Sequence, residues 1–344
     1  MSNLQLDWTE TELLADDRID DALVVRGVTC HGGYVDGRYV SPRSRFRRDA
    51  IAAWQASHRE TFGTDVLDAP LDAFPPHYPS LDQARLLLSN GVPDPVIGIL
   101  TRVGTVEGYG GAIRELAPQG DGQQYFADDV RGTAIAHLSK GLLEAHARDE
   151  SGWGEQAGHD RMWYAVRDIA FEDPLDETGV GELRARMDKA ASSVGPAPVT
   201  APQFDGLDPR FIGLIAFMAR VLFIEIRAFH AFAWAEALLS DSDLVAGNGQ
   251  AAALVACIRQ DESPHVDYLR TVLSEMRART FVGDGGKRYA GTDVIDPIWQ
   301  HCLSESLGHN DKRNRTVTNM LIDDALASRR NGRELREEFD RLAS

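Results

Sequence analysis

Residues 254–276 read LVACIRQDESPHVDYLRTVLSEM and place Glu262 three residues before His265. Apolar side chains recur every three or four positions in this stretch, which predicts an amphipathic helix. At about 100° per residue, Glu262 and His265 fall on the same apolar stripe as Val255 and Ile258. An ionised carboxylate is costly to bury without a partner. A metal ion is the usual partner of a Glu-x-x-His pair on a bundle helix, so further ligands are expected on neighbouring helices.

The chain as a whole is acidic, with 36 Lys and Arg against 53 Asp and Glu among 344 residues, a formal net charge of −17. Nucleic acid and anionic membrane surfaces are not expected as partners, because both are bound by clustered positive charge. The first residues lack the basic-then-apolar order of a signal peptide, so we expect a cytoplasmic protein. The most apolar run, 211–239, is interrupted by Glu225 and Arg227, which indicates a buried helix and not a membrane span.

The chain divides into three expected parts, which are an N-terminal extension over 1–80, a metal-binding helical bundle over 81–282, and C-terminal helices packed on the bundle over 283–344. Residues 24–40 alternate β-branched and aromatic side chains with glycine turns, which predicts a β-hairpin peripheral to the metal. His31 and His77 lie in irregular stretches of the extension and are interpreted as solvated side chains.

The first helix of the predicted bundle covers 94–116 and begins with Asp94 and Pro95, an N-cap residue followed by a proline at the first helical position. Glu107 is the only acid in the middle of its apolar face. Glycines lie beside it, among them Gly104, and they lower helix stability. Either another group approaches Glu107 closely, or the glycines form a notch for packing against another helix.

The longest predicted helix, 209–239, has Glu225 as a lone acid on an apolar stripe. Glu236 falls on the same stripe but lies near the end of the helix, where water can reach it. Apolar side chains around this stripe could wall a substrate pocket or simply form the core; they are Trp163, Met218, Phe229 and Phe232.

The helix predicted over 128–152 has an irregular pattern. Its apolar stripe leads to His146 and Asp149, one turn apart, which we take as the pair of ligands. When this stripe faces the core, Glu144 points away from the core, and Glu150 lies at the edge of the stripe. Glu144 or Glu150 would substitute if the helix were rotated or bulged.

Three further residues leave the identity of the second ligand pair undecided. A π-bulge near Gly141 would turn Glu144 inward instead of His146. Alternatively, His137 or His159 would complete the site instead. His159 lies on the apolar side of an amphipathic stretch, 159–171, where a histidine is more often simply hydrogen-bonded.

The combined ligand set comes from four helices and consists of Glu107, His146 with Asp149, Glu225, and Glu262 with His265. In this set the chain resembles the ferritin-like di-iron or di-manganese carboxylate superfamily, over roughly residues 94–280. The family motif is matched at Glu262-Ser-Pro-His265. The second helix departs from it, because the histidine precedes the acid there.

The resemblance implies a mainly all-α protein, a ferritin-like helical bundle with an N-terminal β-hairpin and extra C-terminal helices. It also implies two iron ions, or manganese in their place, with dioxygen as cosubstrate. The expected activity is that of an oxidase or oxygenase acting on a small organic metabolite. Electrons would come from a separate reductase or from the substrate, and the resemblance leaves room for a homodimer.

Two other interpretations remain open from the sequence. One is a metal-free, all-α binding or scaffold protein whose buried acids are neutralised by arginines, the candidates being Arg102, Arg114, Arg220 and Arg227. The other is a metal storage or binding bundle without oxygen chemistry. Storage proteins of this superfamily are usually compact single bundles, and the added hairpin and C-terminal helices favour a covered substrate site.

Overall fold

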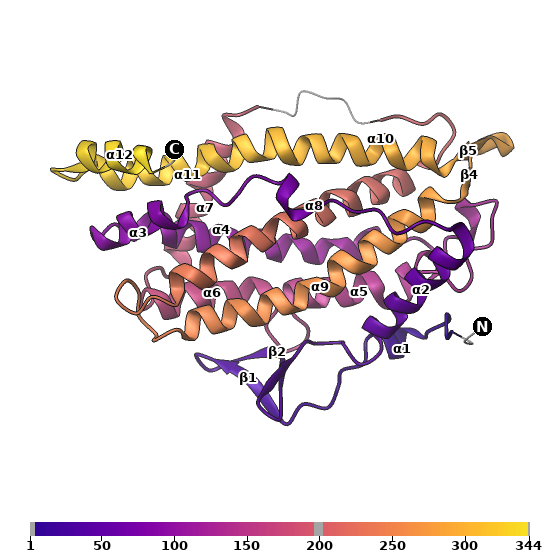
Figure 1. Cartoon of the computed structure of the whole chain (residues 1–344), viewed down its shortest axis with the longest axis horizontal. Helices are drawn as coiled ribbons and strands as arrows, with labels where there is room; N and C mark the ends of the chain where they lie inside the picture. The colour runs from indigo at the N-terminus through magenta and orange to yellow at the C-terminus, as the bar shows by residue number, and fades with distance from the viewer. Residues whose placement is uncertain (1–3, 196–201, 343–344) are drawn as a thin grey trace.

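Five helices run alongside one another and form the centre of the molecule (Figure 1). In this computed structural model, which describes residues 4–195 and 202–342, they are α4 (Asp94–Gly110), α5 (Leu143–Ser151), α6 (His159–Ala170), α8 (Pro209–Leu239) and α9 (Gln250–Arg277). Helix α8 packs along α9, while α4 packs on α6 and α5. The prediction of a mainly helical protein with an N-terminal β-hairpin is confirmed.

The N-terminal sheet has three antiparallel strands, β1 (Asp21–Val25), β2 (Val28–Val35) and β3 (Arg38–Val40). The second turn lies at Asp36 and Gly37, whose φ angles of 48° and 73° fit a two-residue type I′ turn. Strand β2 also joins the loop between α5 and α6, because the His31 N–H donates to the Ala157 carbonyl at 3.1 Å. The sheet is therefore fixed to the bundle beneath α6 and α9 (Figure 1).

The remaining elements surround this centre (Figure 1). Before α5 they are α1 (Glu10–Leu13), α2 (Arg47–Phe62), η1 (Leu71–Ala73), α3 (Leu81–Ser89), η2 (Gly111–Leu116), η3 (Gln123–Tyr125), η4 (Ile135–His137) and η5 (Leu138–Leu142). After α6 they are α7 (Glu177–Ser192), β4 (Thr280–Val282), η6 (Asp284–Gly286), β5 (Arg288–Ala290), α10 (Gly291–Ser304), η7 (Glu305–Asn310), α11 (Asp311–Ala327) and α12 (Gly332–Arg341). Helix α10 packs on α8 and α9, and α11 packs on α4 and α7.

The prediction of a single helix over 128–152 is wrong. Instead η4 is a short 3₁₀ turn, η5 is a π-helical turn, and only α5 is regular. The break occurs at Gly141, whose φ is 121° and where an added Cβ would lie 3.0 Å from Leu13 Cβ. Upstream, Glu275 accepts the backbone N–H groups of Ala134 and Ile135 at 3.2 and 3.1 Å. Contacts from distant segments thus replace helical hydrogen bonds here.

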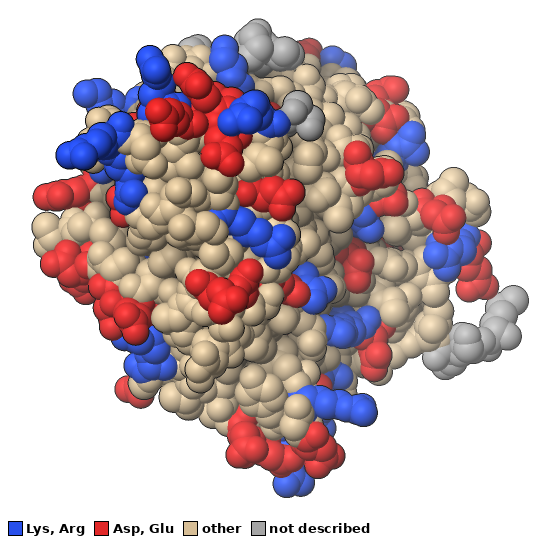
Figure 2. Space-filling view, turned by 60° about the vertical axis from the view of Figure 1, so that its left-hand side comes forward, with Lys and Arg blue, Asp and Glu red and all other residues tan. Residues whose placement is uncertain are grey.

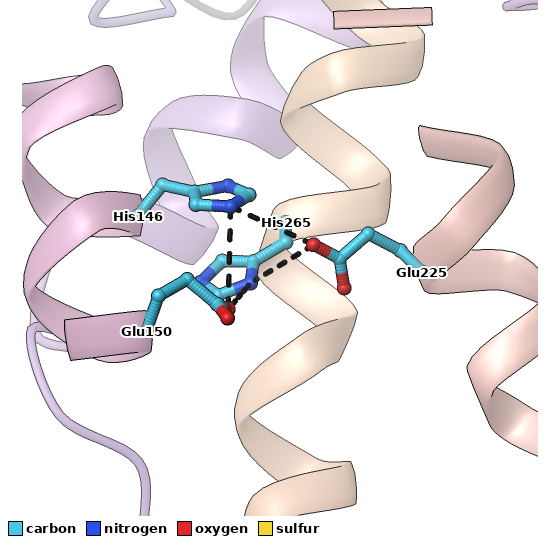
Figure 3. Close-up of side chains that lie close together, drawn as sticks. All are labelled: His146, Glu150, Glu225 and His265. Atoms are coloured by element: carbon cyan, nitrogen blue, oxygen red, sulfur yellow. Dashed lines mark ion pairs between the residues drawn. The ribbon is translucent and has the colours of Figure 1, made fainter. Parts of the chain in front are cut away.

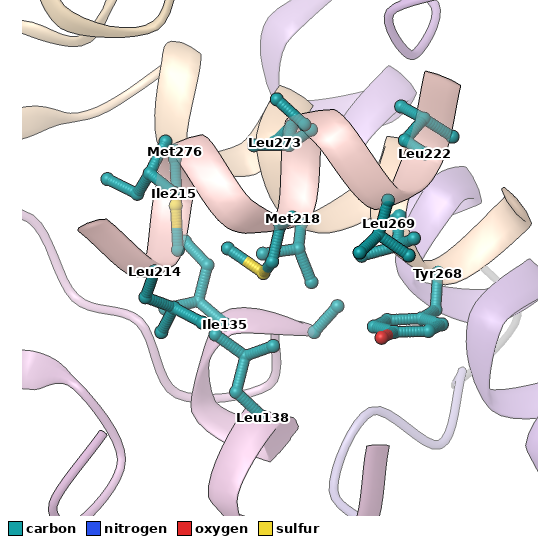
Figure 4. Packing of buried hydrophobic residues seen from close by; sticks show 14 of the residues in the cluster. Ile135, Leu138, Leu214, Ile215, Met218, Leu222, Tyr268, Leu269, Leu273 and Met276 are labelled. Atoms are coloured by element: carbon teal, nitrogen blue, oxygen red, sulfur yellow. The ribbon is translucent and has the colours of Figure 1, made fainter. Parts of the chain in front are cut away.

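A large apolar cluster holds α8 and α9 together, and its centre lies where Met218 and Leu269 meet (Figure 4). Met218 is fully buried, as are Phe232 and Trp163 in a second cluster, so these three side chains belong to the core. Each such side chain contributes roughly 1.5–3 kcal/mol through burial. The site described below is therefore held between tightly packed helices.

The surface carries both signs of charge. On the face in Figure 2, acidic and basic side chains are interspersed and no continuous positive stripe crosses that face. Within 4–195 and 202–342, no helix combines the length and the apolar character that crossing a membrane requires.

Candidate metal centre

Seven histidine and glutamate side chains meet between the five central helices. They are Glu107 on α4, His146 and Glu150 on α5, His159 on α6, Glu225 on α8, and Glu262 and His265 on α9. They form two overlapping groups of four, in each of which the nearest ligand atoms lie within 4.8 Å of one another. The first group is His146, Glu150, Glu225 and His265, and the second is Glu107, Glu150, His159 and Glu262.

The first group is centred on His265 (Figure 3). Its Nδ1 atom lies 3.3 Å from Oε1 of Glu150 and 3.9 Å from Oε1 of Glu225. His146 approaches from α5, with Nε2 3.5 Å from the same oxygen of Glu225. The two imidazole rings stack with centroids 4.0 Å apart. Two nitrogens and two carboxylates from three helices therefore converge on one point.

The second group is centred on His159. Its Nδ1 atom lies 2.9 Å from Oε1 of Glu262 and 3.3 Å from Oε1 of Glu150. The other oxygen of Glu262 lies 2.8 Å from Nδ1 of His265 in the first group. Glu150 and Glu262 thus contact histidines of both groups and link the two groups to each other.

A tight turn brings His159 into the cluster, although it comes from the helix after α5. Gly152 has a φ of 81°, and an added Cβ on Gly158 would lie 2.3 Å from the Gly152 nitrogen. The chain therefore reverses directly after α5 and starts α6 with His159 beside Glu150. The sequence analysis gave His159 only as an alternative ligand, because a histidine on an apolar face is more often simply hydrogen-bonded. The reversal that brings it beside Glu150 leaves no mark in the helical phase.

The outward nitrogen of each histidine faces a buried oxygen. Nδ1 of His146 lies 3.1 Å from the Tyr268 hydroxyl, and Nε2 of His265 lies 2.9 Å from Oδ2 of Asp149. Nε2 of His159 lies 3.5 Å from Oδ2 of Asp261. Such partners orient metal-binding imidazoles and increase their basicity.

Asp149, predicted as a ligand, lies behind the cluster and belongs to neither group. Its Oδ1 accepts a hydrogen bond from Nε of Arg43 at 2.7 Å, and its Oδ2 accepts one from Nη1 of Arg47 at 2.8 Å. Burial alone would raise the pKa of Asp149, but the two guanidinium groups outweigh it and hold the pKa well below its usual range. Glu150, the next residue, faces the cluster in its place.

The N-terminal sheet reaches the back of the centre. Asp261 accepts a hydrogen bond from the Tyr39 hydroxyl at 2.8 Å, and Nε2 of His31 lies 3.4 Å from the same oxygen. His31 is 1% exposed, so the expectation that it is solvated is wrong. With His159 and Asp261 it forms a third group of potential ligands. A single histidine in a β-strand pattern gave no signal for this position.

The remaining sequence candidates lie elsewhere. Glu144 faces away from the centre, as helical phase predicts, and accepts a hydrogen bond from Nε of Arg148 at 2.7 Å. His137 is buried, but its Nε2 accepts the backbone N–H of Trp8. The π-helical turn at Gly141 does exist, yet it ends before His146 and leaves the phase of α5 unchanged.

Both explanations of the glycines near Glu107 apply. An added Cβ on Gly104 would lie 2.8 Å from the Asp160 carbonyl oxygen, so this glycine lets α4 pack closely on α6. An added Cβ on Gly110 would lie 2.6 Å from Cγ of Glu150. The second glycine therefore makes room for a carboxylate of the cluster.

The electrostatics of the cluster suit cations. Burial, together with nearby carboxylates, raises the pKa of Glu107 and of Glu225 well above the usual range. Burial alone would lower the pKa of His265, but Glu262 and other acids outweigh it and raise the pKa to about 10. Several carboxylates in one dry site therefore require positive charge beside them.

The donor atoms also fit metal ions. Among the described residues, Nε2 of His146 is fully buried and has no hydrogen-bond partner. Buried polar atoms are rarely left unpaired unless an ion or water serves them. Imidazole nitrogens and carboxylate oxygens are the ligands of iron, manganese and zinc.

Comparisons of the chain with known protein families, with curated proteins and with solved structures find no match. The fold and the cluster define a class nonetheless. This is a mainly helical protein with a buried histidine and carboxylate site that can hold metal ions.

Proposed function

We propose that the protein is a non-haem dinuclear iron oxygenase or oxidase that uses dioxygen to oxidise a small organic molecule. One observation carries this proposal, namely that Glu150 and Glu262 each contact histidines of both ligand groups. Shared carboxylates between two imidazole-containing groups are the ligand arrangement of the ferritin-like carboxylate proteins.

The donor set favours iron, with manganese as the second choice. Oxygen ligands predominate, and the three cysteines of the chain, Cys30, Cys257 and Cys302, lie in none of the ligand groups of the described residues. The four glutamates of the two groups carry four negative charges when ionised, which balance two divalent cations. Two iron ions, when bound, would supply the reduction of dioxygen and the oxidising power for the substrate.

The residues of the chain have separate roles in this proposal. Glu107 and Glu225 would each help to hold one ion, in separate ligand groups, while Glu150 and Glu262 contact histidines of both groups and would help to hold both. Asp149, Tyr268 and Asp261 hold the outward nitrogens of the three histidines, so that the other nitrogens face inward. The packed helices keep bulk water from the cluster except at Glu107, which is partly exposed while the other six residues are buried.

A cavity of about 420 Å³ connects one side of the centre to the surface. Glu107 is part of its lining, so a substrate in the cavity would meet the cluster at this carboxylate. The volume lies in the range of small-molecule sites, roughly 300–1,000 Å³. The cavity therefore supports a small organic substrate.

The metal-free scaffold is less well supported, because its arginines have other partners. Arg114 lies near Glu144, Arg220 and Arg227 pair with Glu305 and Asp311, and Arg102 donates to the Asn314 carbonyl. These contacts use acids and a carbonyl outside the cluster. A metal storage protein would have the same ligands. An oxygenase would differ from it by coupling oxygen consumption to the oxidation of a second compound.

The decisive experiment measures metal content and oxygen consumption on the full chain. Protein expressed with added iron should retain about two iron ions per chain, and the anaerobically reduced form should consume oxygen when it is mixed with air-saturated buffer. Glu225→Gln should lose both properties, whereas Glu236→Gln on the same helix, 28% exposed and paired with Arg259, should keep both. Purified protein without bound metal after iron supplementation would rule the proposal out. Protein that retained manganese alone would identify manganese, and not iron, as the metal of the site.

A further inference from the structure

The cavity that reaches Glu107 has a charge opposite to that of the whole protein. The charged side chains in its lining are Arg102, Arg184, Arg227, Arg313 and Arg315, against Glu107 and Asp188. Five positive charges thus face two negative ones, within a chain whose formal net charge is −17. A local concentration of positive charge in an acidic protein attracts anions to this cavity.

Two of these arginines share one counterion. Nη2 of Arg227 lies 2.5 Å from Oδ1 of Asp311, and Nε of Arg315 lies 2.8 Å from Oδ2 of the same carboxylate. One acid therefore serves two guanidinium groups. Arg184, the third, donates to the Tyr109 hydroxyl at 3.2 Å. These contacts fix the three side chains around the cavity wall.

Arg102 and Arg313 are in a different position. Arg102 is half-buried and donates to the Asn314 carbonyl at 3.2 Å, but it forms no ion pair with a carboxylate of the described residues. Burial, and then the nearby Arg227, lower the pKa of Arg102 to about 10, which reflects positive charge without a counterion. Arg313 is exposed, and neither a hydrogen bond nor an ion pair joins it to the described part of the chain.

The rest of the lining is largely apolar. Val103 and Val106 lie on α4, Ile224 and Ala228 on α8, and Met187 on α7. Val106 is 43% exposed and Ile224 46% exposed, so both leave apolar surface open in the lining of the same cavity. An apolar wall beside unpaired guanidinium groups suits a molecule with an organic body and an anionic end.

We propose that this cavity binds a small organic anion, whose carboxylate or phosphate group is held by Arg102 and Arg313 and whose apolar body reaches Glu107. The binding of an anion does not depend on the proposed function. Only the statement that this anion is the substrate rests on it. Arg102 and Glu107 are five residues apart on α4, which is about 7.5 Å along the helix axis. The anionic group would thus lie away from the cluster, and the body would be the part that meets it.

Isothermal titration calorimetry with four probes that share one body tests the proposal. The probes are 4-phenylbutyrate, 4-phenylbutyl phosphate, 4-phenylbutan-1-ol and 4-phenylbutylamine. Both anions should bind the wild-type protein at least about tenfold more tightly than the alcohol or the amine, because charge-assisted hydrogen bonds are lost with the neutral and cationic ends. The tighter of the two anions identifies the natural end group. Equal binding of all four probes, or of the amine and the anions, would overturn the proposal.

Three variants locate the binding. Arg102→Gln should weaken anion binding about tenfold, and Arg313→Gln should weaken it severalfold. Arg330→Gln is the matched control, because Arg330 is exposed and lies outside the cavity. This variant should bind the anions as tightly as the wild-type protein does. If Arg102→Gln fails to fold, Arg313 at the exposed rim decides the outcome. Unchanged affinity in the Arg313 variant would then refute the proposal.

Titrations of iron-loaded and EDTA-treated protein separate this inference from the proposed function. If the protein binds the anions but never retains metal, the proposed function is wrong and the anion site is supported. Retained iron without anion binding would end the anion site alone.

Discussion

Nε2 of His265 lies 2.9 Å from Oδ2 of Asp149, and that carboxylate is held in turn by Arg43 and Arg47. An acid that helical phase predicts as a metal ligand therefore lies behind a histidine of the proposed centre and orients it. Nδ1 of His265 is left to face Glu150 and Glu262. These contacts connect the N-terminal region through Asp149 and His265 to the proposed centre.

This relationship separates the roles of two adjacent acids. Glu150→Gln should abolish binding of both metal ions, because Glu150 lies between the two ligand groups. Asp149→Asn keeps the shape and should bind metal about 10–100-fold more weakly. Equilibrium dialysis followed by metal analysis measures both. Equal loss in the two variants would mean that Asp149 is a ligand after all.

His159 should control only one of the two ions. It belongs to the group of Glu107 but not to that of Glu225. His159→Ala should therefore reduce the metal content from about two ions per chain to about one. His309→Ala serves as the control, since His309 lies outside every ligand group among the described residues. A variant of His159 that keeps both ions would contradict its assignment.

Glu144 should be dispensable for metal. It pairs with Arg148 and Arg114, and its side chain is 23% exposed. Glu144→Ala should lower the free energy of unfolding by no more than about 1 kcal/mol, as is usual for partly exposed ion pairs. Its metal content should equal that of the wild type. Urea unfolding and metal analysis of the same preparation measure the two quantities.

Gly110 offers a steric test of the position of Glu150. In Gly110→Ala the new methyl group would meet Cγ of Glu150 at 2.6 Å, so the carboxylate must move and metal affinity should fall. Gly181→Ala is the matched control on α7, because no atom lies within 4 Å of its added Cβ. The control should be neutral or more stable by about 0.4–1 kcal/mol. Unchanged metal affinity in the Gly110 variant would show that Glu150 is not constrained by α4.

Glu275 predicts a dependence of stability on pH that is separate from the metal ligands. Burial raises its pKa from 4.5 to about 7, although Arg279 and two backbone N–H groups oppose the shift. Between these pH values the unfolded chain releases the proton and the folded protein keeps it, so rising pH lowers stability. The total loss is on the order of 3 kcal/mol.

The variant Glu275→Gln cannot titrate at this position. Its free energy of unfolding relative to wild type should therefore rise from pH 4.5 to pH 7 and then level off. Urea denaturation at closely spaced pH values measures this difference. Parallel stability curves for the two proteins would exclude a raised pKa at Glu275.

The sequence predicted the parts of the site that depend on helical phase alone. Glu107, Glu225, Glu262 and His265 are acids or imidazoles on apolar stripes, and the structure brings them together. His146 followed from the same reasoning, because α5 is regular from Leu143 onward.

The remainder depended on segments distant in the chain. Asp149 and Glu150 are both close to the inner face of α5, and only the arginines at 43 and 47 decide which one turns to the cluster. The inward position of His159 depends on the tight turn at Gly152. Neither contact leaves a periodic pattern in the sequence.

The docking of β2 and β3 against Asp261 sets an order in time. The segment that carries His31 and Tyr39 leaves the ribosome first, but its partner follows more than two hundred residues later. Pairing across such a distance in sequence is slow to form. The contact between the sheet and α9 can therefore form only after α9 has been synthesised, and until then the buried acid Asp261 lacks two of its polar partners.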